Sequence, residues 1–238
     1  MTSAVQTWRS GVMSLLHEDR AFLILEADDV DIKPARLEAA TKLLVAAGFE
    51  RPESVASVLM PISVLKSNGS LAEKLNRGVS TFSRWRRISK APISGWTHSY
   101  YERLVGVMGK RNGQTKQLGL DHISHIVEKM NSWKKDVRAG IYAHTNLPSD
   151  RLRVRGAPCL QYIQIELHDG AEFTLNALYR SHDYGNKCLG NLIGLCRLGA
   201  LLSDHTGRKF SRLRIISMNP FLPSGNKKAL ETLVDELA

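Results

Sequence analysis

Residues 160–180 read LQYIQIELHDGAEFTLNALYR and carry the plainest structural signal in the chain. Apolar residues recur at every second position on both sides of the centre, which is typical of two strands that each bury one face. Between them lies Asp169-Gly170, a pair that favours the tight turn of a β-hairpin. We therefore predict strands over 160–167 and 172–180, joined as a hairpin.

Other periodic segments lie on both sides of this hairpin. The predicted helices cover 35–47, 118–135, 190–203 and 226–237, and the further predicted strands cover 139–143 and 210–218. Residues 52–104 contain Pro61 and Pro92 and have weak periodicity, so no element is assigned there. The pattern predicts an α+β fold whose strands are concentrated in the second half.

The length and composition fit one globular domain of ordinary to large size, or two small ones. The chain has 238 residues, of which 43% are hydrophobic, so a sizeable core can form. It contains no apolar run of about 18 residues and begins without a signal-peptide pattern, so we expect no membrane span and a cytoplasmic location. Its three cysteines lack the spacing of a metal site, which favours reduced thiols and no bound metal.

The charge balance predicts an anionic partner. Lysine and arginine number 33 against 23 acidic residues, a formal net charge of +10. Because the basic residues recur in small groups rather than one block, both nucleic acid and a phosphorylated small molecule stay open as partners.

Cys159 is the candidate nucleophile. A cysteine at a sheet edge is commonly a small buried apolar residue, but here Arg151, Arg153 and Arg155 precede it closely and Arg180 ends the partner strand. Cationic neighbours favour the thiolate, which is the reactive form.

Polar residues after the hairpin suit a phosphorylated ligand. Arg180 and Ser181 pair a forked cation with a hydroxyl, a good combination for a phosphate monoester. His182 is read either as a base or as a structural hydrogen-bonding group. Asn191 is read either as a helix cap or as an amide that pairs with the O4 and N3–H edge of uracil.

In their order and spacing, these residues resemble the thymidylate synthase family. The matching elements are Pro158-Cys159, Gln164, Asp169-Gly170, Arg180-Ser181-His182-Asp183 and Asn191, with Arg138 upstream, and the match covers about residues 118–207. The resemblance implies a single domain over 1–238 with a divergent part over 1–110. It also implies a large mixed or antiparallel sheet flanked by helices, and a sheet-to-sheet homodimer.

The resemblance further implies roles for individual residues. Cys159 would add to C6 of a pyrimidine nucleotide, and 5,10-methylenetetrahydrofolate would supply the carbon unit joined to C5. Arg180, Ser181 and Arg138 of the partner subunit would hold the phosphate. Asn191 would read the base, with dUMP or UMP favoured over dCMP or CMP. Asp183 would act in catalysis and contact the folate, and Gln164 would lie at the dimer interface.

The chain also departs from the family pattern. Leu160 replaces the usual histidine after the nucleophile, and Ser217-Met218-Asn219 falls where the family has its sugar-binding pair, so Asn219 becomes the sugar-contact candidate. The family's catalytic glutamate is not found. Tyr101 or Tyr100 matches the active-site tyrosine, with Tyr101 taken as the catalytic candidate and Glu102 as a substitute for the glutamate.

These departures leave the product and two other functions open. The product is either a methylated or a hydroxymethylated pyrimidine. A catalytically lapsed homologue that binds a nucleotide as a sensor or assembly partner is the first alternative. A nucleic-acid-binding or base-modifying protein is the second, since the charge favours it although no binding motif is present.

Overall fold

The computed structural model describes residues 2–30, 34–88, 98–106, 108–111, 114–117, 120–133, 140–147, 150, 157–169 and 171–237. Its centre is a five-stranded sheet with the order β1-β8-β6-β5-β4. These strands are β1 (Leu23–Ala27), β4 (Ile141–His144), β5 (Leu160–His168), β6 (Glu172–Tyr179) and β8 (Lys209–Ser217). All neighbours are antiparallel except β6 and β8, which run parallel. The fold is therefore a mixed α/β fold around a mostly antiparallel sheet, as the sequence predicts.

The predicted hairpin forms from β5 and β6. Ile163 pairs with Ala177 and Ile165 with Leu175, so the alternating apolar residues of both strands lie on one buried face. At the turn, Asp169 has a φ of 47°, a conformation that aspartate tolerates better than most residues. Gly170 lies outside the described residues.

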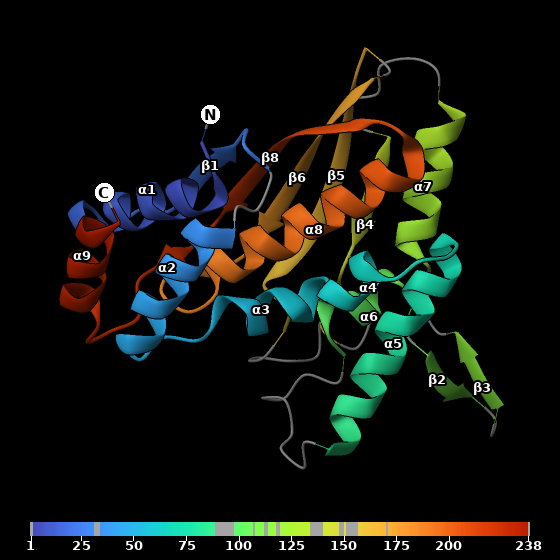
Figure 1. Ribbon diagram of the computed structural model, residues 1–238, viewed down its shortest axis with the longest axis horizontal. Helices are drawn as coiled ribbons and strands as arrows, with labels where there is room; N and C mark the ends of the chain where they lie inside the picture. The colour runs from blue at the N-terminus through green and yellow to red at the C-terminus, as the bar shows by residue number, and fades with distance from the viewer. Residues whose placement is uncertain are drawn as a thin grey trace.

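Helices cover the buried face of the sheet (Figure 1). The helices are α1 (Ala4–His17), α2 (Pro34–Ala46), α3 (Pro52–Leu59), α4 (Ile62–Lys66), α5 (Leu71–Ile88), α6 (Tyr100–Leu104), α7 (His122–Ser132), α8 (Cys188–Thr206) and α9 (Lys227–Glu236). Two short sheets stand apart: β2 (Met108–Arg111) with β3 (Gln114–Gln117), and β7 (His182–Asp183) with β9 (Pro220–Phe221).

The long helix α8 is central to the packing. It is buried on nearly every side because the sheet lies behind it and α3 packs along it, below α8 in the view (Figure 1). Gly190 and Gly194 allow this approach. A Cβ at Gly190 would lie 2.4 Å from Cβ of Val55 and 2.6 Å from the carbonyl oxygen of Pro52. One hydrophobic cluster extends from Trp8 in α1 to Val234 in α9.

The opposite face of the sheet carries two rows of half-buried or exposed side chains. One row crosses all five strands and consists of Tyr142, Gln164, Asn176, Arg214 and Glu26, each residue paired with the next across the strands. The adjacent row consists of His144, Tyr162, Leu178, Ile216 and Ile24. The first row is mainly polar and the second mainly apolar.

No helix in the described ranges is both long and apolar enough to cross a lipid bilayer.

Candidate functional site

Cys159 lies immediately before β5, at the open end of the hairpin, and its side chain is half-buried. Its carbonyl oxygen accepts a hydrogen bond from the backbone N–H of Arg180 at 2.9 Å. The Arg180 side chain also donates to the carbonyl oxygens of Pro158 (Nε, 3.0 Å) and Ala157 (Nη2, 2.8 Å). The hairpin therefore brings the predicted nucleophile and the predicted phosphate-binding arginine together.

Burial and charge act in opposite directions on the Cys159 thiol. Burial raises its pKa, Arg180 lowers it, Asp183 raises it, and Lys187 lowers it. Because burial is the largest of these effects, the pKa lies above the usual value of a thiol. This differs from the sequence-based expectation that cationic neighbours would favour the thiolate. Arg151, Arg153 and Arg155, on which part of that expectation depended, lie outside the described residues.

Tyr100, rather than Tyr101, reaches Cys159. The Tyr100 hydroxyl accepts hydrogen bonds from the backbone N–H groups of Cys159 at 2.8 Å and Leu160 at 3.0 Å. The Tyr101 hydroxyl donates to the Leu75 carbonyl at 2.7 Å, and its ring stacks on Phe82. Burial raises the pKa of both tyrosines, so both hydroxyls stay protonated at neutral pH. The structure thus places Tyr101 against α5 and leaves Tyr100 as the tyrosine beside the thiol.

Two local structures fix α6, which carries Tyr100. Ser99 and Glu102 form a capping box, in which the Glu102 carboxylate accepts from the Ser99 N–H and hydroxyl, each at 2.8 Å. Arg103 makes a buried ion pair with Asp150, at 2.5 Å and 3.1 Å, and also donates to the Thr145 carbonyl. Glu102, the substitute suggested for the family's glutamate, is therefore occupied in capping this helix.

Asp183 closes a tight turn between β7 and α8. Its carboxylate accepts from the N–H groups of Gly185 and Asn186, both at 2.9 Å, and from the Asn186 side chain at 3.0 Å. Ser181 is half-buried and follows Arg180 directly, so it lies at the same end of the hairpin. These contacts give Asp183 a structural task in addition to the catalytic and folate-binding roles predicted for it.

Asn191 lies in the first turn of α8 and is 6% exposed. Its side-chain Nδ2 lies 3.0 Å from Nε2 of His182. The other ring nitrogen of His182, Nδ1, lies 2.9 Å from the Ser217 hydroxyl, which is 3.1 Å from the hydroxyl of Tyr184. The His182 ring stacks on Tyr179, with ring centroids 4.1 Å apart. Asn191 is thus not a helix cap, since Lys187 holds that position.

The remaining predicted residues are spread more widely. Asn219 is exposed, and its backbone carbonyl accepts from the His182 N–H at 3.0 Å. Gln164 lies in the polar row on the far face of the sheet, and Leu160 is fully buried. Arg138 lies outside the described residues.

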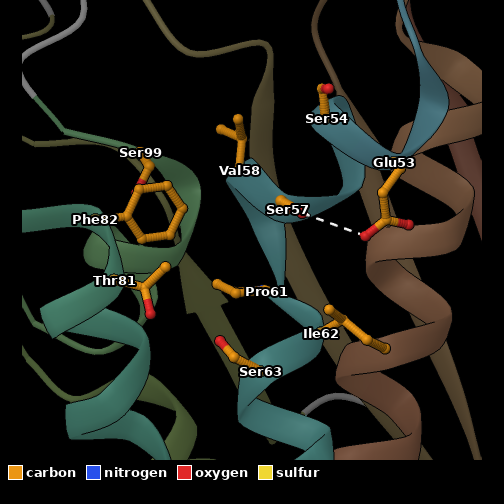
Figure 2. A pocket seen from close by; sticks show the side chains of 10 residues that line it. All are labelled: Glu53, Ser54, Ser57, Val58, Pro61, Ile62, Ser63, Thr81, Phe82 and Ser99. Carbon is orange, nitrogen blue, oxygen red and sulfur yellow. Dashed lines mark hydrogen bonds between the residues drawn. The ribbon is translucent and has the colours of Figure 1, made fainter. Parts of the chain in front are cut away.

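A cavity of about 490 Å³ opens beside α6 (Figure 2). Hydroxyl groups of Ser54, Ser57, Ser63, Thr81 and Ser99 line it together with the apolar side chains of Val58, Pro61, Ile62 and Phe82. Ser99 immediately precedes Tyr100, so one short helix contributes to both the cavity wall and the Cys159 site. The cavity is mainly apolar with hydroxyl groups at its edges.

Glu53, in the first turn of α3, also lines this cavity, and sequence analysis missed it. Its carboxylate lies 2.5 Å from Nη2 of Arg197 in α8, and the Ser57 hydroxyl lies 3.5 Å from it (Figure 2). The Glu53 side chain is 44% exposed, whereas the Arg197 side chain is 6% exposed. Weak periodicity hid this glutamate, although Pro52 at the start of a helix is a recognisable signal.

Comparisons with known proteins agree with the resemblance found in the sequence. A protein of Methanosarcina barkeri named "Putative thymidylate synthase" is 28% identical over 156 residues, which cover 63% of this chain and 66% of the relative. A Methanopyrus kandleri protein of the same name is 28% identical over 127 residues, covering 53% of this chain and 55% of the relative. A third, from Methanosarcina acetivorans, is 26% identical over 151 residues, which cover 63% and 66%.

The match therefore spans between about half and two thirds of these curated relatives. No family model matches the chain. The similarity to these relatives supports a divergent thymidylate synthase-like family.

Proposed function

We propose that this protein is a thymidylate synthase-like transferase that adds a one-carbon unit, methyl or hydroxymethyl, to C5 of a pyrimidine nucleotide. The observation that carries the proposal is the arrangement around Cys159. A half-buried thiol, an arginine and a buried tyrosine hydroxyl meet where the hairpin opens, beside the turn that leads to Asn191. The names of the curated relatives support the same class of reaction.

In the proposed reaction, the sulfur of Cys159 forms a bond to C6 of the base. The electron pair of the C5–C6 double bond moves toward C5 and O4, and C5 becomes a nucleophile. After C5 gains the carbon unit, a base takes the C5 proton and the bond between the carbon unit and its carrier breaks. Water would then add to this carbon to give hydroxymethyl, or hydride from the carrier would reduce it to methyl. Loss of the Cys159 thiolate from C6 then restores the double bond. Because burial raises the thiol pKa, we expect Cys159 to be protonated in the free protein and to lose its proton as the sulfur bonds to C6.

The substrate would be held mainly at its phosphate. Arg180 directs Nε and Nη2 to backbone carbonyls, and the remaining donors of its guanidinium would bind the phosphate together with Ser181. Arg138 of the partner subunit would add a second cation. Asn219, exposed beside the small β7–β9 sheet, would contact the sugar. Binding energy at the phosphate would thus position C6 against the sulfur.

The cavity beside α6 fits a carrier such as 5,10-methylenetetrahydrofolate. Its apolar walls and the Phe82 ring suit a flat heteroaromatic group, and its serine and threonine hydroxyls suit the polar edge of that group. When bound, the folate would supply the carbon unit that joins C5. Asp183, at the turn before α8, is the residue proposed to make a polar contact with the folate outside the cavity.

Glu53 is the candidate for the acid–base group that the sequence left unassigned. It is the carboxylate among the residues that line the cavity, and the buried Arg197 holds it in place. A Glu53→Gln variant keeps the shape and removes the charge. We expect it to bind nucleotide as the wild type does and to turn over at least about 100-fold more slowly, the usual contribution of a positioned acid or base.

A homodimer would form through the exposed face of the sheet. The apolar row of His144, Tyr162, Leu178, Ile216 and Ile24 lies beside the polar row that contains Gln164. The rings of Tyr142, His144 and Tyr162 contact one another in this region. An exposed patch of this kind, bordered by polar groups, is typical of a protein interface.

Tritium release tests the reaction itself. With methylenetetrahydrofolate present, we expect the protein to release tritium to water from C5-labelled UMP or dUMP, and mass spectrometry would identify the product as methyl or hydroxymethyl. Cys159→Ser should release none, whereas Cys196→Ala, which removes a thiol inside α8, should retain release. Release by Cys159→Ser at the wild-type rate would show that Cys159 is not the nucleophile.

A second candidate function is nucleotide binding without catalysis. The raised pKa of Cys159 and the apolar Leu160 beside it are the observations that support this second candidate. It predicts thermal stabilisation by one of UMP, dUMP, CMP or dCMP without tritium release from any of them. Steeply salt-dependent binding to oligonucleotides, with no mononucleotide binding, would instead indicate a nucleic-acid-binding protein.

A further inference from the structure

A buried chain of side-chain hydrogen bonds connects Asn191 to the interior of the protein. Asn191 Nδ2 contacts His182 Nε2 at 3.0 Å, His182 Nδ1 contacts the Ser217 hydroxyl at 2.9 Å, and that hydroxyl contacts the Tyr184 hydroxyl at 3.1 Å. Tyr184 is in turn hydrogen-bonded to the Cys188 thiol. His182, Ser217, Tyr184 and Cys188 are each at most 1% exposed.

The first contact fixes the direction of the others. An amide nitrogen only donates, so Nε2 of His182 accepts and the ring proton lies on Nδ1. Nδ1 then donates to Ser217, whose own proton is left to donate to Tyr184, and the Tyr184 proton is left for Cys188. Every donor in the series has an acceptor. As long as Nδ1 carries the ring proton, turning the Asn191 amide over would place Oδ1 against the lone pair of Nε2, which is unfavourable in a low-dielectric interior.

The His182 ring cannot readily change its position. It stacks on Tyr179 with an interplanar angle of 4°, and its backbone N–H donates to the Asn219 carbonyl at 3.0 Å. Burial lowers the pKa of His182 to about 3, so the ring is neutral at physiological pH and one nitrogen must remain an acceptor. With Nδ2 of Asn191 facing Nε2, that acceptor is Nε2.

We propose that His182 is a positioning residue that holds the carboxamide of Asn191 in one orientation, with Oδ1 directed toward the bound base, and so makes the site select uracil over cytosine. This inference rests on the proposed function, in which Asn191 reads the base. Uracil presents an acceptor at O4 and a donor at N3, and cytosine presents the reverse. An amide free to turn over would match both bases, whereas a fixed amide matches one of them.

The first test requires no ligand. Long-range nitrogen–proton NMR of the protein labelled at histidine should show His182 protonated on Nδ1, with the signal assigned by its absence in His182→Phe. A proton on Nε2 would require Asn191 to present its oxygen to the ring and would overturn the proposal.

The second test measures the ratio of dissociation constants for CMP and UMP, and for dCMP and dUMP, by calorimetry. We expect His182→Phe, which keeps a ring against Tyr179, to lower the ratio at least about 10-fold by strengthening cytosine binding relative to uracil binding. Ser217→Ala, which frees the ring proton, should lower it in the same direction. Tyr179→Phe is the matched control, because the Tyr179 hydroxyl has no hydrogen-bond partner among the described residues, and it should keep the wild-type ratio.

The outcomes separate this inference from the proposed function. If the wild type selects uracil and both His182→Phe and Ser217→Ala retain that selectivity, the positioning role is wrong and the proposed function stands. A wild type that binds no pyrimidine nucleotide overturns both. A lower ratio in both variants, with tritium release from uracil nucleotides retained, supports the positioning role.

Discussion

Cys159 shows how one side chain is subject to opposing effects. The arginines near it in the sequence suggested a thiolate, but the pKa depends on burial as well as charge, and burial is not visible in a list of neighbouring residues. The net result is a thiol whose pKa is raised. Arg180 still opposes that shift, and its two hydrogen bonds to the carbonyls before Cys159 keep it close.

Alkylation by iodoacetamide across a pH series tests this balance. The rate at Cys159 should still be rising at pH 9, since the thiolate fraction grows until pH exceeds the raised pKa. Arg180→Met should slow the reaction at pH 8 because it removes the cation that lowers the pKa. Asp183→Asn should speed it because it removes a negative charge. Equal rates in all three proteins would contradict the electrostatic account.

His182 gives stability a dependence on pH. Its pKa is about 3 in the folded protein and near 6.5 when exposed, so the unfolded chain binds a proton in this window and the folded chain does not. Stability from this group is complete above pH 6.5 and falls as pH drops toward 3, by about 1.4 kcal/mol per pH unit.

Urea unfolding at pH 7.5, 6 and 5 would measure this effect. We expect the free energy of unfolding of His182→Phe to depend less steeply on pH than that of the wild type. The other titrating groups are common to both proteins, so their effects cancel when the two are compared. Identical slopes for the two proteins would mean that His182 is protonated in the folded state.

The sequence narrowed the candidate tyrosine only to a pair of residues and favoured Tyr101, whereas Tyr100 is the one that contacts Cys159. Tyr100 and Tyr101 are adjacent on α6, and neighbouring residues of a helix point about 100° apart, so one side chain reaches Cys159 and the other reaches α5. Choosing between them required knowledge of which face of this short helix meets the sheet. The periodicity of a five-residue helix is too short to supply it.

Among the elements, strong periodicity made most of the second half of the chain and one helix of the first half predictable. The hairpin, the strand at Lys209–Ser217 and the helices at Pro34–Ala46, Cys188–Thr206 and Lys227–Glu236 all form close to the expected ranges. The helix at His122–Ser132 is shorter than predicted, and residues 118–119 and 134–135 lie outside the described chain.

The first half was less predictable, and the shortness of some elements explains only part of this, because α1 has 14 residues and α5 has 18. Helices α3, α4 and α6 have eight, five and five residues. Helices α4 and α6 are too short for two full repeats of an amphipathic pattern, and α3 is barely long enough. Helix α1 and strand β1 were not predicted at all. β1 has only five residues and gains its hydrogen bonds from β8, which lies 186 or more residues later in the sequence.

The contact between α3 and α8 depends on the missing side chain of Gly190. Gly190→Ala places a Cβ 2.4 Å from Val55 and 2.6 Å from the Pro52 carbonyl, so α3 must move. We expect a loss of about 1–3 kcal/mol in the free energy of unfolding and weaker nucleotide turnover, because α3 carries Glu53.

Gly194→Ala is the comparison variant, because it introduces a milder clash with α3 than Gly190→Ala does. Its Cβ would lie 3.0 Å from Cβ of Leu59, so the loss measured by urea unfolding should be smaller than that of Gly190→Ala. A larger loss at Gly194 would show that the distance to α3 does not govern the cost.

At the scale of the whole molecule, the two faces of the sheet differ in what covers them. Helices pack on one face, and the other carries the apolar row and the polar row over all five strands. Alternation in each strand indicates two faces, but the register that aligns Tyr162, Leu178 and Ile216 in one row depends on pairing between strands far apart in the sequence.

Light scattering after gel filtration tests the proposed dimer. Ile24, on the apolar row, is 50% exposed, and Val45, on α2, is 42% exposed. We expect the wild type and Val45→Lys to be dimers and Ile24→Lys to be a monomer, because a lysine in a paired apolar face loses hydration without gaining a partner. A monomeric wild type would contradict the sheet-to-sheet arrangement.

The short parallel pairing of β7 with β9 determines how much of the chain must be synthesised before this region can fold. The N–H groups of His182 and Tyr184 donate to the carbonyls of Asn219 and Phe221, and Ser217 completes the hydrogen-bond series to Asn191. A ribosome must therefore have translated the chain past Phe221 before the neighbourhood of Cys159 has its native contacts. Nascent chains released earlier would lack a formed site, and such incomplete products should be open to proteases at residues 180–187.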